Sequence, residues 1–520
     1  MLGFAVASAA LAAATGSWGI PHNDDWSMLR IAEHLADTGE LRLLGWNRMS
    51  LVGQSVPAAG VLRLAGGGVA TLQAVNLVAA TAVLALATLL LRRFLPPGRA
   101  TLGAMTLLGT CELWLLSTSF MTDVSAAALV LGSLLLGVAA LRAPGRRAAR
   151  LLLAGAVLVG LWAFTVREGA LAAPAAVLLV VVASRCRTDL RAVAWPLAVG
   201  GLVAAGLFEL WRRSLGGDDA PVVVVDVGDT TAHLLEALFW TGLVLSPVTL
   251  FLAARWRRRR TWLAAGVAGC LAVALRLGLD RSMFPPNYLS PRGAYPTAEL
   301  GPRATLVPAG VWAGVCVVAV VSAGVLLERL AVRVTDRHRR PAEDRTDPAA
   351  AVLPWFLALT AAGFGVQDLV GQNTYSRYLL VLPPVVAVLV LRSVPRPASR
   401  SRERTAGAVV LLSALVTLAV VLTAGTLRSD TARWTAAQEL VDRGVDPMSI
   451  AVGQEWSGWH TKTAAVHAGR DAPGDQGWWT GMFSDASECW LVATDDRPHT
   501  GYRLVSAEPG AWVFRAEAAC

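Results

Sequence analysis

The chain has 520 residues, of which 55% are hydrophobic and only 16% are charged. One soluble core cannot bury that much apolar surface, so the composition excludes an ordinary soluble protein and indicates an integral membrane protein. The formal net charge of +9 does not indicate a nucleic-acid partner, because the arginines stand in short clusters between apolar runs.

Thirteen apolar segments are predicted as membrane helices, since each approaches the ~20 residues that a helix needs to cross a bilayer. The first, residues 2–20, lacks the basic start of a secretory signal. It is interpreted as a retained helix, with a cleaved signal peptide as the alternative. The other twelve are residues 69–91, 100–116, 124–141, 151–166, 169–184, 192–210, 232–254, 262–279, 305–327, 349–370, 378–394 and 406–427.

The arginines predict the orientation of these helices. Arginine clusters follow the segments that end at residues 91, 141, 184, 254, 327 and 394, which places them in every second loop. Positively charged loops are retained in the cytoplasm. We therefore expect a multi-pass protein of the plasma membrane whose domain 1–427 is transmembrane. The intervening loops and residues 428–520 should be extracytoplasmic.

The first outer loop, residues 20–68, has unusual polar content. Asp24 and Asp25 precede Trp26 and an amphipathic run that stops at Gly39. This pattern predicts a helix lying along the membrane surface. The carboxylates could cap that helix, but one cap is sufficient. Asp24 and Asp25 are therefore predicted as catalytic residues, and Trp26 as a substrate contact.

Asp123 stands in a very short outer loop between two spans. It could cap the following helix. Held at the same interface as Asp24, it could instead help to orient an acceptor hydroxyl, and we count it among the catalytic candidates. Carboxylates from two loops could also bind a divalent cation such as Mg²⁺ or Mn²⁺, so Asp24 and Asp123 are predicted as metal ligands.

Two arginines interrupt the apolar pattern on the predicted outer side, in Arg167-Glu168 and in Arg377-Tyr378. An arginine fork donates two parallel hydrogen bonds and suits a phosphate. The alternative is an arginine that extends to the interface and contacts lipid headgroups without specificity. These four residues are predicted to bind substrate.

Two further outer segments are distinctive. The turn-rich loop of residues 280–303 could close over a cleft or act as a passive connector. Residues 428–520 lose the membrane pattern and predict a small α/β domain with one sheet. Cys489 and Cys520 share this compartment, where one disulfide is compatible with the oxidising environment.

Five motifs, taken in chain order, resemble those of the C-type (GT-C) membrane glycosyltransferases. Within that class the resemblance is specifically to the bacterial family-39-like relatives of protein O-mannosyltransferases and of the lipid A aminoarabinose transferase. The motifs are Asn23-Asp24-Asp25-Trp26, Phe120-Met121-Thr122-Asp123, Arg167-Glu168, Ser376-Arg377-Tyr378-Leu379-Leu380 with Pro383-Pro384, and Glu455-Trp456-Ser457-Gly458-Trp459.

The resemblance implies a polytopic helical fold and a polyprenyl-phosphate sugar donor whose lipid tail lies in a membrane groove. It also implies that a first-loop aspartate acts as general base, with inversion at the anomeric carbon. Asp24 is then the base, Asp123 the second acidic position and Arg377 the phosphate ligand. Asp25 stands where many relatives have glutamate, so either member of the pair could be the base. The acceptor could be a glycan, a lipid or a protein.

Two other classes of function are weighed against the enzyme. A secondary transporter would show paired halves and ionisable groups near the bilayer midplane. A non-catalytic assembly or sensor protein would use residues 428–520 as its binding module. The polar clusters at the outer ends of the spans favour the enzyme.

Overall fold

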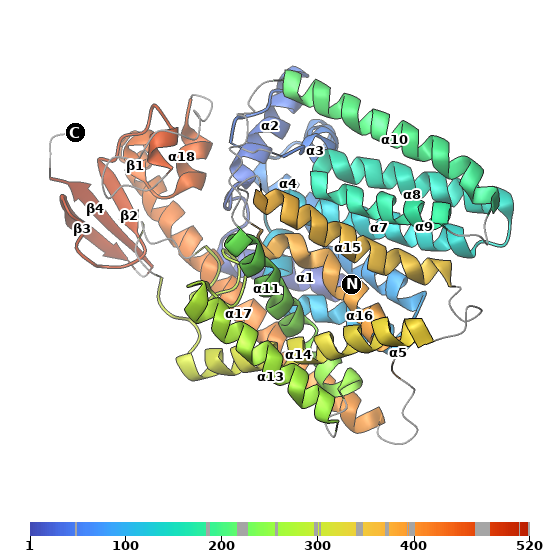
Figure 1. Cartoon of the computed structure of the whole chain (residues 1–520). Helices are drawn as coiled ribbons and strands as arrows, with labels where there is room; N and C mark the ends of the chain where they lie inside the picture. Colours follow the sequence, from blue (N-terminus) through green and yellow to red (C-terminus); the bar gives the residue numbers. More distant parts are fainter. Residues whose placement is uncertain are drawn as a thin grey trace.

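The computed structural model is a helical body with a small sheet at one end (Figure 1). It describes residues 1–46, 49–183, 188–215, 227–254, 258–295, 300, 303–339, 347–369, 374–392, 394, 401–462, 479–508 and 510–517. The helices of the body are α1 Leu2–Thr15, α2 Asp25–Thr38, α3 Val52–Ala65, α4 Val69–Arg92, α5 Pro97–Met105, η1 Thr106–Gly109, α6 Cys111–Ser117, α7 Thr122–Arg142, α8 Arg146–Val166, η2 Glu168–Leu171, α9 Ala172–Ala183, α10 Thr188–Ser214, α11 Val227–Val244, α12 Ser246–Val248, η3 Thr249–Ala253, α13 Arg259–Val273, η4 Ala274–Gly278, α14 Ala309–Arg339, α15 Pro348–Leu369, η6 Ser376–Val381, α16 Leu382–Leu391 and α17 Ser401–Asp442.

Each predicted membrane segment coincides with one of these helices or with a bent pair of them. In the part of the chain that the structure describes, eight helices are long and apolar enough to cross a membrane, or up to ten if each bent pair is one span. The apolar helices Leu2–Thr15, Glu168–Ala183 and Ser376–Leu391 are shorter. The fold class predicted from the sequence is therefore confirmed, with fewer full-length spans than the thirteen predicted.

Several arginine-rich loops meet at one end of the body. Arg142 and Arg392 both pair with Asp347, at 3.0 and 2.8 Å. Arg142 also donates to the backbone carbonyl of Arg93, and Arg99 donates to that of Val394. Loops that the sequence assigns to one side thus lie together. That this side faces the cytoplasm remains a prediction.

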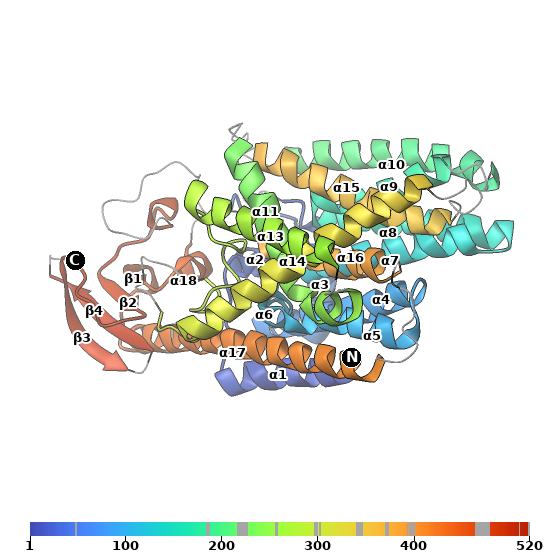
Figure 2. The ribbon, with the colours of Figure 1, turned by 60° about the horizontal axis from the view of Figure 1, so that its bottom comes forward.

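Helix α17 joins the body to the C-terminal part. Its 42 residues make a helix about 63 Å long at 1.5 Å per residue, about twice the thickness of the hydrocarbon core. It lies beside α1 along the body and carries the C-terminal sheet at its far end (Figure 2). The predicted boundary at residues 427 and 428 falls inside this continuous helix, because its polar second half keeps helical geometry.

The C-terminal part is built from strands β1 Ile450–Ala451, β2 Trp490–Ala493, β3 Tyr502–Glu508 and β4 Ala511–Ala516, with η7 Pro447–Ser449, α18 Gln454–His460 and η8 Thr480–Met482. The sheet has the order β1-β2-β4-β3, with β1 parallel to β2 and the other pairs antiparallel. The single predicted sheet is thus present. Cys489 is disulfide-bonded, and its predicted partner Cys520 lies outside the described residues.

The first outer loop contains two helices. The predicted surface helix is α2, which ends at Gly39 with a positive φ of 78°. Helix α3 was not predicted, because its sequence has neither a long apolar run nor a regular polar face. Asn47 and Arg48, which precede it, lie outside the described residues. Helix α2 packs against α3 on one side and against α18 on the other.

Candidate active site

The side chains of Asp24, Arg377 and Asp123 lie in one row. Asp24 Oδ2 is 3.6 Å from Arg377 Nη2, and Arg377 Nε is 3.7 Å from Asp123 Oδ1. The carboxylate of Asp24 is 21% exposed, whereas the side chains of Arg377 and Asp123 are 4% and 1% exposed. Among these three, Asp24 is therefore the one that an incoming molecule can reach.

Arg167 lies on the other side of Asp123. Its Nη2 is 3.0 Å from Asp123 Oδ1, and its Nε donates to Thr122 Oγ1 at 3.0 Å. The guanidinium also lies 4.3 Å from the ring centre of Tyr378. Asp123 thus lies between two guanidinium groups and contacts both.

Tyrosines surround the Arg377 guanidinium. Its Nη1 donates to the hydroxyl of Tyr288 at 3.2 Å, and its carbon atom lies 4.9 Å from the ring of Tyr375 and 5.4 Å from that of Tyr378. Burial raises the pKa of Tyr288 to about 12, so this phenol keeps its proton at neutral pH. Aromatic rings around a cation hold it in place by cation–π attraction and form few hydrogen bonds that would compete with those of a ligand.

Tyr288 was not predicted as a site residue. It comes from the turn-rich loop that the sequence flagged as a lid or a connector. The structure buries Tyr288 completely and packs its ring against Tyr295 of the same loop, with the ring centres 5.0 Å apart. The loop therefore forms part of the site, and the proline-rich run before Tyr288 was the signal available in the sequence.

The second oxygen of Asp24 faces a different set of groups. Oδ1 accepts hydrogen bonds from Trp46 Nε1 at 3.0 Å and from Gln454 Nε2 at 3.1 Å. Gln454 also donates to Asn23 Oδ1 at 2.9 Å. Gln454 belongs to α18, so the C-terminal part reaches the carboxylate of Asp24 directly. Sequence reasoning did not find Gln454, although it stands immediately before the Glu455 motif.

Asp25 has different surroundings from Asp24. Its side chain is fully buried, Oδ1 accepts from the backbone amide of His22 at 2.7 Å, and Oδ2 accepts from that of Phe120 at 3.0 Å. Burial raises the pKa of Asp25 to about 7. Asp25 thus ties the first outer loop to Phe120, just before helix α7, whose first turn carries Asp123. Asp24 is the carboxylate of the pair that faces Arg377, and a catalytic part for Asp25 remains a prediction.

Trp26 is also buried and lines neither of the cavities described below. Its ring packs edge-on against Trp46 and Phe483, with ring centres 5.2 and 5.9 Å apart. Gly458 of α18 lies directly over the ring, where a Cβ atom would overlap it. Arg30 of α2 donates to the backbone carbonyl of Gly458 at 2.9 Å. Trp26 therefore docks α18 on α2, and its contact with substrate remains a prediction.

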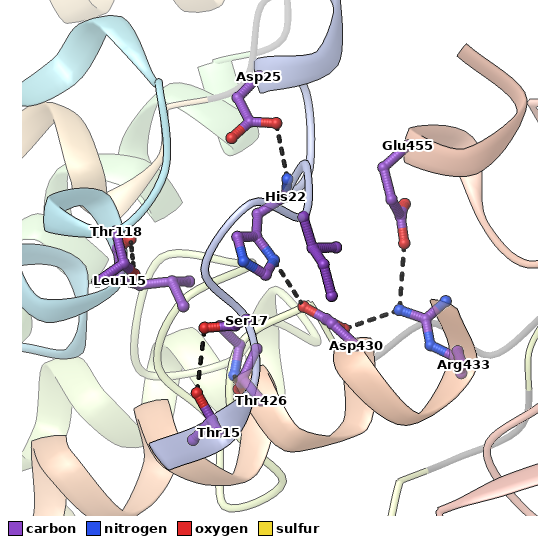
Figure 3. A network of polar contacts seen from close by, with 12 residues as sticks. Thr15, Ser17, His22, Asp25, Leu115, Thr118, Thr426, Asp430, Arg433 and Glu455 are labelled. Carbon is purple, nitrogen blue, oxygen red and sulfur yellow. Dashed lines mark hydrogen bonds and ion pairs between the residues drawn. The ribbon is translucent and has the colours of Figure 1, made fainter. Parts of the chain in front are cut away.

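A buried ionic cluster fixes the turn before Asp24 (Figure 3). His22 Nδ1 is 3.4 Å from Asp430 Oδ2, and Arg433 joins Asp430 to Glu455 at 2.8 and 3.2 Å. Burial opposes a charge on His22, but the hydrogen bond and charge of Asp430 prevail, aided by Asp25 and Glu455, and its pKa is raised. The cluster links the first loop, α17 and α18.

A cleft of about 100 Å³ opens beside Arg377. Its polar end is formed by Asp123, Arg167, Glu168, Arg377 and Tyr378. Glu168 is held there by a hydrogen bond of 2.7 Å from Ser50 Oγ. The remaining wall residues are mostly apolar and come from α7, the turns before α9 and α16, and α15: Ala126, Ala127, Val130, Gly169, Ala170, Phe356, Thr360, Phe364, Gln367, Leu380 and Val381.

A second cavity of about 140 Å³ lies on the side of Asp24 that faces Gln454. It is lined by Asn23 of the first loop, by loop residues Asn287, Tyr295, Leu300 and Arg303, by Asp430 and Arg433 of α17, and by Gly453, Gln454, Glu455 and Trp479. The two cavities have no lining residue in common. The Asp24 carboxylate contacts a residue of each, Gln454 through Oδ1 and Arg377 through Oδ2.

The predicted metal site does not fit this geometry. The guanidinium of Arg377 lies near both Asp24 and Asp123, and Arg167 contacts the same oxygen of Asp123. Two cations therefore already face the two carboxylates that were expected to share a metal ion. The part of the chain that the structure describes contains no group of three or more His, Cys, Asp or Glu residues placed to hold one.

No family model and no curated protein matches the chain. Two solved structures of ArnT from Cupriavidus metallidurans are similar to it. The apo form is 12% identical, with a TM-score of 0.45, over 99% of this chain and 98% of that chain. The form bound to undecaprenyl phosphate is 11% identical, with a TM-score of 0.46, over 99% and 97%. The functional proposal for this chain rests on its own residues.

Proposed function

We propose that the chain is a membrane glycosyltransferase that moves a sugar from a polyprenyl-phosphate donor to an acceptor hydroxyl, with inversion at the anomeric carbon. The observation that carries the proposal is the position of Asp24. Its carboxylate lies 3.6 Å from Arg377, which lines the polar end of a cleft whose other walls are mostly apolar. This arrangement would place a base next to a phosphate ligand and a lipid groove.

The cleft suits a molecule with an anionic head and a hydrocarbon tail. Arg167 and Arg377 form its polar end, and Arg377 is buried, where an arginine attracts an anion more strongly than in water. Asp123 contacts both guanidinium groups, and Asp24 also lies near that of Arg377. The phosphate of the donor would bind at these guanidinium groups, and its prenyl chain would extend between α7 and α15.

Asp24 would act as the general base. The acceptor oxygen attacks the anomeric carbon while its proton moves to a carboxylate oxygen of Asp24. The bond between the anomeric carbon and the phosphate oxygen breaks, and the polyprenyl phosphate leaves with the bonding electrons. Arg377 and Arg167 would stabilise the charge that develops on the departing phosphate. One displacement of this kind inverts the configuration at the anomeric carbon.

Trp46 and Gln454 support that assignment. Their hydrogen bonds to Oδ1 hold the carboxylate of Asp24 in one orientation. A base must lie within hydrogen-bond reach of the proton it removes, and preorganisation of its side chain lowers the cost of reaching that geometry. On this proposal the site faces the outer side of the membrane, opposite the arginine-rich loops.

The proposal is tested with the purified chain in lipid nanodiscs. Radiolabelled decaprenyl-phosphate and undecaprenyl-phosphate sugars are supplied together with a bacterial envelope extract as the source of acceptors. We expect release of the free polyprenyl phosphate and transfer of the label, with no turnover of nucleotide sugars. Nanodiscs without the chain provide the control. Uptake of intact donor into proteoliposomes without cleavage would contradict the proposal and favour a transporter.

A further inference from the structure

We propose that the second cavity, between Asn23 and Gln454, binds the acceptor of the transfer reaction and that this acceptor presents an uncharged, hydroxyl-bearing sugar unit. The inference rests on the proposed function, since it concerns the substrate that Asp24 deprotonates. Three observations carry it: the connection of the cavity to Asp24, the charge balance of its walls and its unpaired polar atoms.

The cavity meets Asp24 on the side opposite the phosphate ligands. Gln454 lines it and donates to Asp24 Oδ1, whereas Arg377 lies at Oδ2 and lines the other cleft. In an inverting displacement the attacking oxygen and the leaving oxygen lie on opposite sides of the reacting carbon. If the donor phosphate binds at Arg377, the acceptor oxygen therefore approaches the anomeric carbon from the Gln454 side.

The charges of the cavity wall compensate one another. Arg303 pairs with Asp430 at 2.6 Å, and Arg433 pairs with Asp430 and Glu455 at 2.8 and 3.2 Å. Arg303 and Arg433 thus face Asp430 and Glu455, and all four side chains are buried. His22, which does not line the cavity, also contacts Asp430. An anionic ligand would have to break these pairs, and breaking a buried pair is costly. A neutral ligand can bind without disturbing them.

Three side chains of the wall have buried polar atoms for which the described residues provide no hydrogen-bond partner. Asn23 Nδ2 and Arg433 Nε are donors, and Gln454 Oε1 is an acceptor. Buried polar atoms are normally paired, so each indicates a missing partner. A sugar hydroxyl can accept from the two donors, and an adjacent hydroxyl can donate to Gln454. Trp479 adds an aromatic side chain to the same wall.

The conformation of Asn23 is fixed by its neighbours. Asn23 has a φ of 54°, in the left-handed region, which asparagine adopts more readily than most other residues with a side chain. Its own Oδ1 accepts from Gln454, and Asp25 accepts from the amide of His22.

The test measures binding of small neutral sugars to the full-length chain in nanodiscs by saturation-transfer NMR. The probes are methyl α-mannoside, methyl β-galactoside and methyl α-arabinofuranoside, with glucose 1-phosphate as the anionic comparison. Asn23→Gly removes the amide while keeping the backbone conformation, and Gln454→Ala removes the second contact. Gln438→Ala is the matched control, because Gln438 is an exposed glutamine on α17 that donates to Asp442 one helix turn further on.

We expect at least one methyl glycoside to bind to the wild type and to Gln438→Ala with equal affinity, and at least fivefold more weakly to Asn23→Gly and Gln454→Ala. Undecaprenyl phosphate should bind to all four proteins within twofold. The inference is overturned if none of the glycosides binds, if the two cavity variants bind them as well as the wild type does, or if glucose 1-phosphate binds more tightly.

A competition experiment tests whether the cavity holds the acceptor sugar or the donor sugar. If a polyprenyl-phosphate sugar displaces the glycoside and plain undecaprenyl phosphate does not, the cavity holds the donor sugar and the acceptor assignment is wrong. Failure of the proposed function gives a different result, because undecaprenyl phosphate would then fail to bind to the wild type.

Discussion

Asp24 and Arg377 are far apart in the sequence of the membrane region, yet Asp24 Oδ2 lies 3.6 Å from Arg377 Nη2. Asp24 ends the turn before the first surface helix, and Arg377 belongs to the turn before α16. The long membrane helices between them bring the two residues together. This pair places a base next to a phosphate ligand, and the following predictions depend on it.

Replacing Arg377 should weaken binding of the donor phosphate. Arg377→Gln removes a charge-assisted contact of about 1.5–3 kcal/mol, so we expect the Kd for undecaprenyl phosphate to rise roughly 10- to 100-fold. Arg377→Lys keeps the charge without the planar fork and should show an intermediate loss. Scintillation proximity with labelled lipid measures these values. Arg443→Gln provides the control, because Arg443 is an exposed arginine just after α17 that pairs with Glu439. Unchanged affinity in Arg377→Gln would remove Arg377 as the phosphate ligand.

Filling the cleft should exclude the prenyl chain. Thr360 of α15 lines the cleft and is partly buried. Thr360→Trp should lower the affinity for undecaprenyl phosphate at least tenfold while affecting a short-chain phosphate such as citronellyl phosphate little. Thr360→Val keeps the volume of the side chain and serves as the matched variant. Equal losses for long-chain and short-chain phosphates would place the hydrocarbon chain elsewhere.

Docking of α18 should depend on Gly458. A Cβ at this position would overlap the buried Trp26 ring, so Gly458→Ala must displace α18 from α2. Overpacking of this kind costs about 1–3 kcal/mol. We expect a lower midpoint of thermal unfolding. We also expect the rate of sugar transfer to fall at least tenfold, because the displaced α18 would move Gln454 out of hydrogen-bond reach of Asp24. Gly266→Ala, at an exposed helix position with open space, should be neutral. Wild-type behaviour of Gly458→Ala would contradict the docking role.

The His22 cluster should make stability depend on pH. The raised pKa of His22 means that folding favours its protonated form. The stabilisation that this proton gives to the folded state is fully present below the ordinary histidine pKa of 6.5. It is lost as the pH rises through the raised pKa of His22 in the folded state. Asp430 of α17, Asp25 and Glu455 are the charged groups that act on it. We expect the unfolding midpoint, followed by tryptophan fluorescence, to fall from pH 6 to pH 8.5.

His22→Gln isolates this contribution, because it removes the titrating ring while other groups remain. The variant should be less stable than the wild type at pH 6, and the difference should shrink as the pH rises. A difference between the two proteins that is constant from pH 6 to pH 8.5 would show that His22 does not titrate in the folded chain as proposed.

The sequence predicted the membrane helices because their signal is local. Apolar length alone located a helix at every predicted segment, and Gly39 marked the end of α2 where the chain needs a positive φ. The strands of the C-terminal sheet were found by their short apolar runs. Helix α3 was missed, since it has neither a long apolar run nor a regular polar face.

The partners within the site could not be predicted in the same way. Which of Asp24 and Asp25 faces Arg377 depends on the turn at Asn23, and Asp25 instead binds the amide of Phe120, far away in the sequence. Tyr288 and Gln454 reach the site only because the loop before α14 and helix α18 pack over the first loop. Such contacts between distant segments leave no periodic pattern in the sequence.

The central claim is that Asp24 removes the acceptor proton while Arg377 holds the donor phosphate. The most direct test compares wild type, Asp24→Asn and the exposed-site control Asp37→Asn in single-turnover reactions, with labelled polyprenyl-phosphate sugar already bound. We predict that Asp24→Asn binds the donor within threefold of the wild type and cleaves it at least 100-fold more slowly, in the range for loss of a general base. Asp37→Asn should match the wild type. Equal cleavage rates for Asp24→Asn and the wild type would contradict the account.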